Sequence, residues 1–343
     1  MKQNEISHLK QYIFFLLLSG LGGGFFGLVI PKYSDPEYSI ALSFCIGFLI
    51  GFCICVLAIL FDNKFKIIIR KYKMPLLLEL SIRTLYYALI IPAVFYSIFY
   101  IFRLQEEIST LLFPVMIYSL GASFFINMLA IIINLIGPPD FLRLISGRYS
   151  RPFEEERIFM FIDIKGSTAL AENLGNLKFH SFLNDFIFFI TPSILECKGE
   201  IYKYIGDEII VSWNTKNALK HLNCLRIFFL IVNSIQDKKS YFETEYGTVP
   251  EFRAGIHIGK VIVGEMGDIK KEIAYLGDVV NTTARIISVA SERSLPLLGS
   301  KDIVNFVSNN KLKTDYLFTE IKEVILRGKS NQSAVYQITE NIM

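Results

Sequence analysis

The first 136 residues contain four long stretches without a charged side chain, and this pattern constrains the fold more than any other feature. Each stretch reaches the ~20 apolar residues that a helix needs to cross a bilayer. Buried helices of soluble proteins rarely come as such a series, and 52% of all residues are hydrophobic. We therefore expect an N-terminal membrane domain over residues 1–136, a four-span helical bundle with spans at Tyr12–Ile30, Tyr38–Phe61, Thr84–Phe102 and Ile108–Ile136.

Charges beside these spans predict their orientation. The segment between the second and third spans is basic, with Lys64, Lys66, Arg70, Lys71 and Lys73, whereas the other two loops are mainly acidic, with Asp35, Glu37, Glu106 and Glu107. Positively charged loops stay in the cytoplasm. We therefore expect a multi-pass protein of the cytoplasmic (inner) membrane, with the lipid bilayer as a partner and both termini cytoplasmic.

The spans themselves carry few groups with chemical function. None contains a His or Lys, so haem ligation and a retinal Schiff base are unsupported. The first span has a series of glycines, which suit either a close helix contact or a lipid-facing surface, and the sequence leaves both open. These residues are Gly20, Gly22, Gly23, Gly24 and Gly27.

Residues 137–157 are expected to link the spans to a second domain. Pro138 and Pro139 should end the fourth span, and Pro152 should end a short amphipathic helical segment that follows. The length of this segment does not distinguish a signalling helix from a passive linker.

The remaining residues, 158–340, alternate between strand and helix patterns. We expect a strand at Ile158–Asp163, a hairpin at Gly206, a helix near Asn217–Ile235, two strands joined near Gly259 and Lys260, and a helix at Asp278–Ser291. With two late strands, these elements predict an α+β domain whose sheet is largely antiparallel.

Two carboxylates fall at predicted strand ends in this domain. Asp163 closes the apolar run FMFID before a turn at Gly166, and Asp207 follows Gly206 between two β-like runs. Carboxylates at neighbouring strand ends can hold a pair of Mg²⁺ ions, which activate a hydroxyl and neutralise a leaving phosphate. The pattern therefore favours phosphoryl-type chemistry.

Three segments, FMFIDIKGST, IYKYIGDEII and EIAYLGDVVNTTARI, resemble those of the class III nucleotidyl cyclases. The resemblance covers Arg157 to about Gln337. It implies a ferredoxin-like, palm-like catalytic domain that works as a homodimer, with each site at the interface. It also implies conversion of a nucleoside triphosphate to a 3′,5′-cyclic monophosphate and pyrophosphate with two divalent cations, Mg²⁺ or Mn²⁺.

The resemblance also assigns roles to individual residues. The metal ligands would be Asp163, Asp207 and the backbone carbonyl of Ile164. The catalytic residues would be Asn281, which orients the ribose, and Arg285, which stabilises the α-phosphate. These two are four residues apart and so share one helix face. The nucleotide-binding residues would be Gly166, Ser167, Thr168, Lys203, Ala274, Arg327 and Lys329.

One position departs from the family pattern. Seven residues before Asn281, the family usually has Asp, Thr or Ser in contact with the base, whereas this chain has Ala274, which cannot accept a hydrogen bond. Lys203 still favours adenine, because guanylate-specific relatives carry an acid there. We expect ATP as the substrate of an adenylate cyclase. A guanylate cyclase and a catalytically silent membrane receptor remain alternatives.

Two other classes fit the sequence less well. A diguanylate cyclase should carry a GGDEF-like hairpin, and the hairpin here reads YIGDE. The net charge of +3 is too small to predict a nucleic-acid partner.

Overall fold

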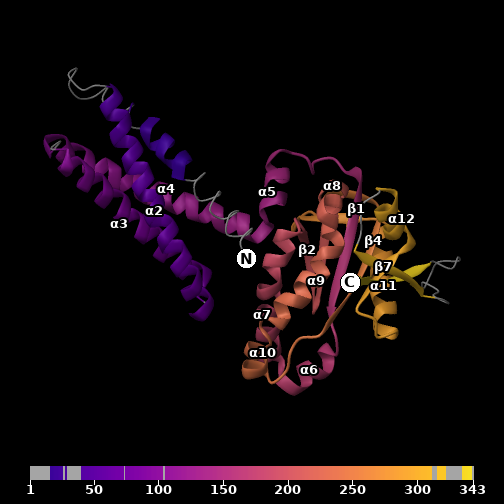
Figure 1. The fold of residues 1–343 in the computed structure, drawn as a ribbon. Helices are drawn as coiled ribbons and strands as arrows, with labels where there is room; N and C mark the ends of the chain where they lie inside the picture. The colour runs from indigo at the N-terminus through magenta and orange to yellow at the C-terminus, as the bar shows by residue number, and fades with distance from the viewer. Residues whose placement is uncertain are drawn as a thin grey trace. The chain divides into compact units, whose positions relative to one another are not determined.

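The computed structural model describes residues 16–25, 28, 40–72, 74–102, 105–310, 315–321 and 334–341. The chain forms two compact units, an N-terminal unit that ends at Pro138 and a C-terminal unit that begins at Pro139 (Figure 1).

The N-terminal unit is built from apolar helices. These are the short helix Leu16–Phe25 and the long helices α2 (Ile40–Tyr72), α3 (Leu76–Ile101) and α4 (Gln105–Ile136). Ile40–Ile69, Leu76–Ile101 and Val115–Ile133 are each long and apolar enough to cross a bilayer. The second, third and fourth predicted spans thus fall on long apolar helices, whereas parts of the first lie outside the described residues.

Helix α2 is longer than the sequence pattern indicated. A loop was expected after Phe61, but the helix continues through the basic residues to Tyr72. At the same level, Arg83 Nε of α3 donates to Glu79 Oε1 at 3.0 Å, and Arg83 also forms an ion pair with Asp62 of α2. An ion pair therefore joins α2 to α3 near the C-terminal part of α2 and the N-terminal part of α3.

The glycines of the first apolar helix include a close packing contact. A Cβ atom on Gly23 would lie 2.2 Å from the carbonyl oxygen of Gly47 in α2, and one on Gly51 would lie 2.3 Å from that of Ser19. Ser19 Oγ also donates to the Gly51 carbonyl at 2.8 Å. Of the two alternatives for these glycines, close helix packing therefore holds for Gly23, whereas a Cβ on Gly22 would meet nothing within 4 Å.

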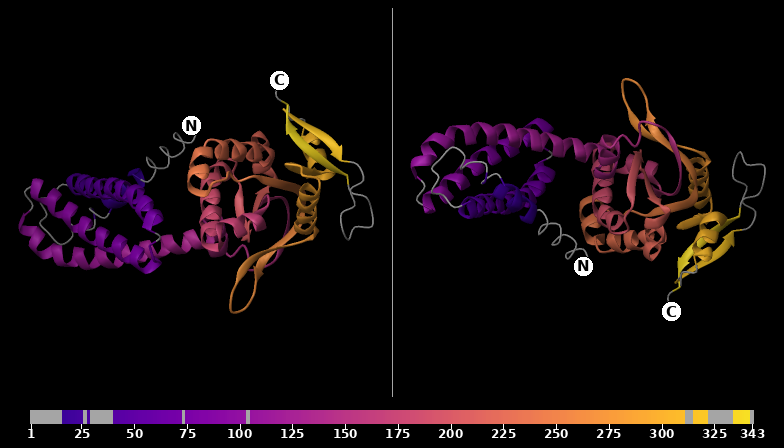
Figure 2. Two further views of the ribbon diagram at one scale, coloured as in Figure 1. Left: turned by 90° about the horizontal axis from the view of Figure 1, so that it is seen from below. Right: turned by 90° about the horizontal axis from the view of Figure 1, so that it is seen from above.

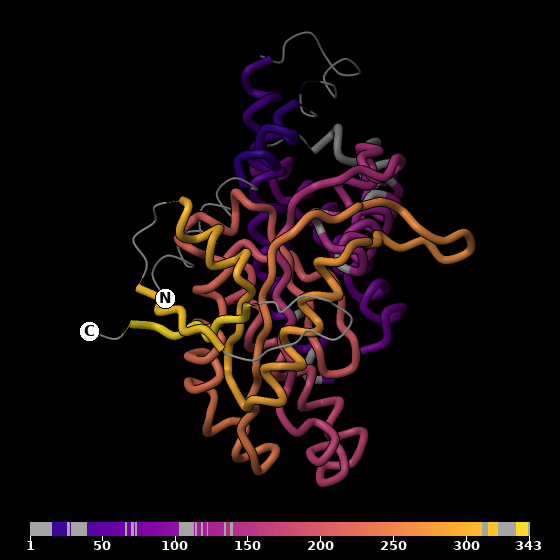
Figure 3. Tube along the Cα trace, turned by 90° about the vertical axis from the view of Figure 1, so that its right-hand side faces the viewer, coloured from indigo at the N-terminus to yellow at the C-terminus, as the bar shows by residue number. Residues whose placement is uncertain are grey.

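The C-terminal unit contains one mixed sheet, as expected largely antiparallel. Its order is β2-β3-β1-β4-β6-β8-β7, with β5 paired to β4, and among the strands of the described residues only β4 and β6 pair in parallel. The strands are β1 (Phe153–Ile164), β2 (Glu200–Ile205), β3 (Glu208–Asn214), β4 (Phe252–Met266), β5 (Glu272–Leu276), β6 (Leu297–Ser300), β7 (Tyr316–Ile321) and β8 (Val335–Glu340). In Figures 2 and 3 the β4–β5 hairpin extends well beyond the rest of this unit.

Helices cover both faces of the sheet. They are α5 (Pro138–Ile145), α6 (Ser167–Leu174), α7 (Asn176–Glu196), α8 (Thr215–Leu219), α9 (Asn223–Gln236), α10 (Lys239–Tyr246), α11 (Asp278–Glu292) and α12 (Lys301–Asn309). The segment Thr215–Gln236, which contains α8 and α9, is also long and apolar enough for a membrane span. Half of its apolar window is buried, and α9 packs into the core of this unit, which accounts for its hydropathy.

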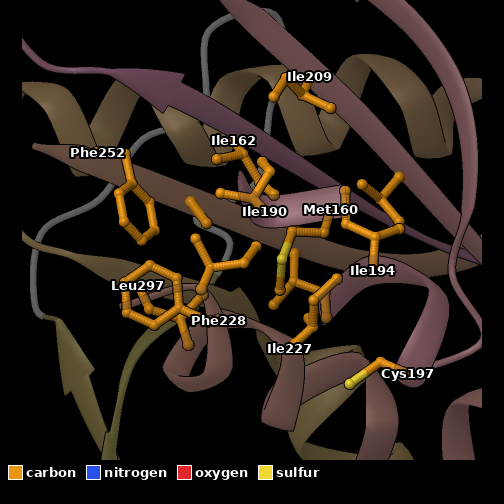
Figure 4. Close-up of a cluster of buried hydrophobic side chains, with 14 of the residues drawn as sticks. Met160, Ile162, Ile190, Ile194, Cys197, Ile209, Ile227, Phe228, Phe252 and Leu297 are labelled. Carbon is orange, nitrogen blue, oxygen red and sulfur yellow. The ribbon is translucent and has the colours of Figure 1, made fainter. Parts of the chain in front are cut away.

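The side chains of β1 alternate between the two faces, as expected for a strand. Met160 and Ile162 pack with α7 and α9 in the larger core (Figure 4), whereas Phe159 and Phe161 pack with α11 in a second cluster. Asp163 has the same parity as Phe161. The alternation therefore places its carboxylate on the α11 face of the sheet.

The expected pair of strands around Gly259 and Lys260 is wrong, because β4 runs unbroken from Phe252 to Met266. The glycines of β4 serve helix packing instead of a turn. A Cβ on Gly255 would lie 2.7 Å from the backbone nitrogen of Ile287, and one on Gly259 would lie 3.2 Å from Cβ of Val279. Glycine in a strand often marks such a close approach, which here lets α11 lie directly on β4.

A buried ionic cluster ties α5 to the sheet. Arg143 of α5 donates to both carboxylate oxygens of Glu200 at 2.9 and 2.7 Å, and Arg157 of β1 donates to Glu200 as well. Arg157 is 1% exposed and lies 4.9 Å from the ring centre of Tyr275. Burial alone would raise the pKa of Glu200, but the two arginines hold it below its usual value.

We expect Glu200→Ala to destabilise the protein by about 3–5 kcal/mol, because Arg157 would keep a buried charge without its main partner. For a unit of this size the loss corresponds to a melting temperature lower by on the order of 10 °C, measurable on the detergent-solubilised chain. Glu251→Ala is the matched control, since Glu251 is 77% exposed and pairs with Lys165 at 3.6 Å. Equal melting temperatures for the two variants would refute a structural role for the cluster.

Candidate active site

Asp163 lies at the end of β1 and is held by a cross-strand partner. It faces Arg253 in the β1–β4 register, and Arg253 Nε donates to Asp163 Oδ2 at 2.8 Å. Opposite charges at directly paired positions attract each other across a sheet. The strand pairing therefore fixes one carboxylate oxygen and orients the other.

Asp207 occupies the two-residue turn between β2 and β3, whose ends Ile205 and Glu208 are paired. Gly206 precedes it with φ of 63°, a left-handed conformation that glycine adopts without strain. Asp207 Oδ2 is buried and accepts no hydrogen bond from the described residues. A buried polar atom without a partner is costly, and a bound cation would satisfy it.

The Asp163 and Asp207 carboxylates are close enough to perturb each other. Burial raises the pKa of Asp163, and the charge of Asp207 raises it further against the opposing effect of Arg253. Burial and the charges of both aspartates raise the pKa of Glu208 to about 7. Negative charge therefore concentrates where a divalent cation would relieve it.

The side chains that could bind a cation here are the carboxylates of Asp163 and Asp207. Among the described residues no three or more His, Cys, Asp or Glu side chains are grouped to hold one metal ion. Mg²⁺ is commonly held by one or two carboxylates, with substrate phosphates and water completing its shell. Asp163 and Asp207 therefore fit this type of cation, and the carbonyl of Ile164 follows directly in β1.

A few residues after Asp163, the chain enters helix α6. Gly166, with φ of 66°, is the residue before the helix, and Ser167 and Thr168 form its first turn. The first amides of a helix have no partner within the helix and are suited to bind anions. This terminus follows Asp163 by only a few residues, so amide donors and carboxylates lie at the same end of β1.

Helix α11 presents the two predicted catalytic side chains away from its packed face. Val279, Thr283 and Ile286 are buried, whereas Asn281 is exposed and Arg285 is half-buried. The ion pair that the described residues provide for Arg285 is with Asp278, at 4.0 Å. Asp278, in the first turn of α11, also accepts a hydrogen bond from Thr282 Oγ1 at 3.1 Å.

The predicted base-reading residues come from two strands. Lys203 is exposed on β2, and Ala274 is buried in β5 opposite Gly264 of β4. Lys203 Nζ lies 3.2 Å from Glu272 Oε2, and Glu272 is two residues before Ala274. The predicted phosphate-binding residues Arg327 and Lys329 lie outside the described residues.

Sequence reasoning missed Arg253, Glu208 and Glu272. Glu208 directly follows Asp207, so its position in the sequence was enough to identify it as a candidate. Arg253 and Glu272 reach the site through strand pairing and a contact 69 residues apart in the chain. No local pattern revealed them.

The mixed sheet, with a carboxylate pair at its strand ends and polar side chains on α11, is the architecture of a nucleotidyl cyclase catalytic domain. The adenylate and guanylate cyclase catalytic domain matches residues 150–340, more than half of the 343 residues. The chain belongs to this family.

Two curated relatives extend this finding. Adenylate cyclase 2 of Rhizobium meliloti (strain 1021) is 35% identical over 190 residues, which cover 55% of this chain and 52% of the relative. The adenylate cyclase of Anabaena cylindrica is 26% identical over 182 residues, 52% of this chain and 36% of that protein. The matched part thus spans about half or less of each relative.

A solved structure shares the fold. A bacterial light-regulated adenylyl cyclase superposes with a TM-score of 0.57 over 66% of either chain, at 18% sequence identity. The predicted fold class, a cyclase catalytic domain that follows N-terminal apolar helices in the sequence, is confirmed.

Proposed function

We propose that this chain is a membrane-anchored adenylate cyclase that converts ATP to 3′,5′-cyclic AMP and pyrophosphate. The observation that carries the proposal is the buried oxygen of Asp207, near Asp163, for which the described residues provide no hydrogen-bond partner. Family membership and the name of the Rhizobium meliloti relative support adenylate as the product.

Asp163, Asp207 and the carbonyl of Ile164 would hold two divalent cations, Mg²⁺ or Mn²⁺. When bound, the cations lower the pKa of the substrate 3′-hydroxyl and neutralise charge on the phosphates. Arg253 keeps Asp163 oriented by its hydrogen bond. The amides of Gly166, Ser167 and Thr168 face the phosphate chain at the start of α6.

The remaining groups act on the ribose, base and phosphates. The 3′-hydroxyl attacks the α-phosphorus in line, and the bond to the pyrophosphate oxygen breaks. Arg285 donates to the α-phosphate as charge develops in the transition state, because its planar guanidinium offers several donors. Asn281 orients the ribose and Lys203 donates to the base. Arg327 and Lys329 are proposed to bind the terminal phosphates.

A homodimer with shared sites follows from the same proposal. Asp163 and Asp207 of one protomer would face Lys203, Asn281 and Arg285 of its partner across a two-fold axis. Exposed apolar side chains support an interface on the β4–β5 hairpin and at the end of β2. They are Tyr204, Ile205, Ile262, Met266 and Leu276.

The apolar helices of the N-terminal unit support anchoring in the cytoplasmic membrane. The basic residues that close α2 favour a cytoplasmic location for that end, and hence for both termini. This orientation brings the catalytic unit to cytosolic ATP.

The test is an assay of the detergent-solubilised chain with ATP or GTP, each with Mg²⁺ or Mn²⁺. We expect cyclic AMP as the main product, and Lys203→Glu should reduce kcat/KM for ATP and narrow its advantage over GTP. Cyclic GMP as the main product would identify a guanylate cyclase, which Ala274 leaves open. Absence of either product would identify a silent receptor and overturn the proposal.

A further inference from the structure

The base-reading position taken by Ala274 lacks a polar atom, but its neighbour on the same side of the strand has one. Ile273 and Tyr275 of β5 pack against the cluster that contains Phe159 and Val279. Because side chains alternate along a strand, Glu272 and Ala274 project to the opposite side. The Glu272 carboxylate is thus the nearest acidic group along the same side of β5.

Glu272 forms an ion pair with Lys203, the residue assigned to base recognition. Lys203 Nζ lies 3.4 Å from Glu272 Oε1 and 3.2 Å from Oε2, and both side chains are 44% exposed. An exposed ion pair of this kind stabilises a fold by ~0–1 kcal/mol, so stability explains little of its presence. The ammonium keeps donors, and the carboxylate keeps lone pairs, for a further ligand.

The pair is complementary to the edge of adenine. That edge presents a ring nitrogen acceptor, N1, next to an amino donor on C6, which match an ammonium beside a carboxylate. Guanine in the same position presents N1–H and a carbonyl oxygen at C6, so donor would face donor and acceptor would face acceptor. The polarity of the pair therefore favours adenine.

We propose that Glu272 accepts a hydrogen bond from the 6-amino group of adenine and replaces the acceptor that Ala274 lacks, while Lys203 donates to N1. The proposal rests on the adenylate cyclase function proposed above. It makes Glu272 a specificity-determining residue and assigns the Lys203–Glu272 pair to base recognition.

The test compares ATP with purine ribonucleoside triphosphate, which is ATP without the 6-amino group. The detergent-solubilised wild-type chain should prefer ATP in kcat/KM by about 10- to 100-fold, as expected for a hydrogen bond to a charged group. Glu272→Ala should lower kcat/KM for ATP and bring this ratio close to one, with the analogue little affected. Glu272→Gln, which keeps a neutral acceptor, should fall between.

Two further variants make the result specific. Glu265→Gln is the matched control, because Glu265 lies on the same hairpin and pairs with Lys271 at 3.0 Å, and it should leave the ratio unchanged. In the Glu272→Ala background, Ala274→Ser should restore part of the ratio by returning an acceptor.

The proposal would be overturned if Glu272→Ala left the ratio of kcat/KM for ATP to kcat/KM for the analogue unchanged. Equal losses of kcat/KM for both nucleotides would also overturn it, because Glu272 would then only position Lys203. A wild-type chain that makes no cyclic AMP from ATP would instead overturn the proposed function. The two failures are thus distinct.

Discussion

Asp207→Asn is expected to reduce cyclic AMP formation by more than about 100-fold, the size of effect seen when a preorganised electrostatic group is lost. Asn has nearly the same shape but no charge, so it would hold a divalent cation poorly. Asp163→Asn should behave in the same way. The measurement is kcat of the detergent-solubilised chain with saturating Mg²⁺ or Mn²⁺.

The melting temperature distinguishes the loss of a metal ligand from the loss of the folded structure. Because burial and the charge of Asp207 raise the pKa of Asp163, the ionised pair is unfavourable in the folded chain, and Asp207→Asn should not lower the melting temperature. Mn²⁺ should raise the melting temperature of the wild type and not of either variant. The control is Asp237→Asn, an exposed carboxylate at the end of α9. Activity within a few-fold of wild type in Asp207→Asn would remove Asp207 from the metal site.

Coexpression of Asp163→Ala and Arg285→Ala chains is expected to restore activity that neither chain has alone. In the mixed dimer one site carries both changes and the other carries neither. Each purified mixed dimer keeps one working site of two, so about half of the wild-type activity per dimer should return. The measurement is cyclic AMP formation by tagged, co-purified heterodimers.

Coexpression of Asp163→Ala with Asp207→Ala chains is the matched control for this experiment. Both changes lie on the metal side of the site, so each site of the mixed dimer keeps one of them and activity should stay absent. If verified Asp163→Ala/Arg285→Ala heterodimers are inactive, the sites are not shared between protomers. The head-to-tail homodimer would then have to be abandoned.

Most of the candidate site was predictable because its residues sit in local patterns. Asp163 follows an apolar strand pattern, and Asp207 follows a glycine in a hairpin pattern. Both can therefore be assigned to strand ends before the order of strands in the sheet is known. Spacing by four residues places Asn281 and Arg285 on one side of α11. By contrast, the Arg253 contact depends on the β1–β4 register, which joins residues 90 positions apart.

The errors of the sequence reading have a similar origin. Gly259 and Lys260 resemble a turn when only their neighbours are considered, yet β4 passes through them because α11 needs the space beside Gly255 and Gly259. Hydropathy alone predicts that the second span ends at Phe61. The helix continues to Tyr72 because the lysines and the arginine of this segment are good helix formers, and Asp62 pairs with Arg83 of α3.

The sequence alone determined the apolar helices, the cyclase family, the strand-end carboxylates and the absence of an acceptor at Ala274. These features depend on residue type and on spacings of a few residues, which hydropathy and turn chemistry encode directly. The tertiary structure decided that Arg253 holds Asp163 and that a buried oxygen of Asp207 has no partner among the described residues. It also decided that Glu200 pairs with Arg143 of α5 and Arg157 of β1, and that Glu272 contacts Lys203. Each of these depends on strand register and burial, which arise only when distant segments pack together.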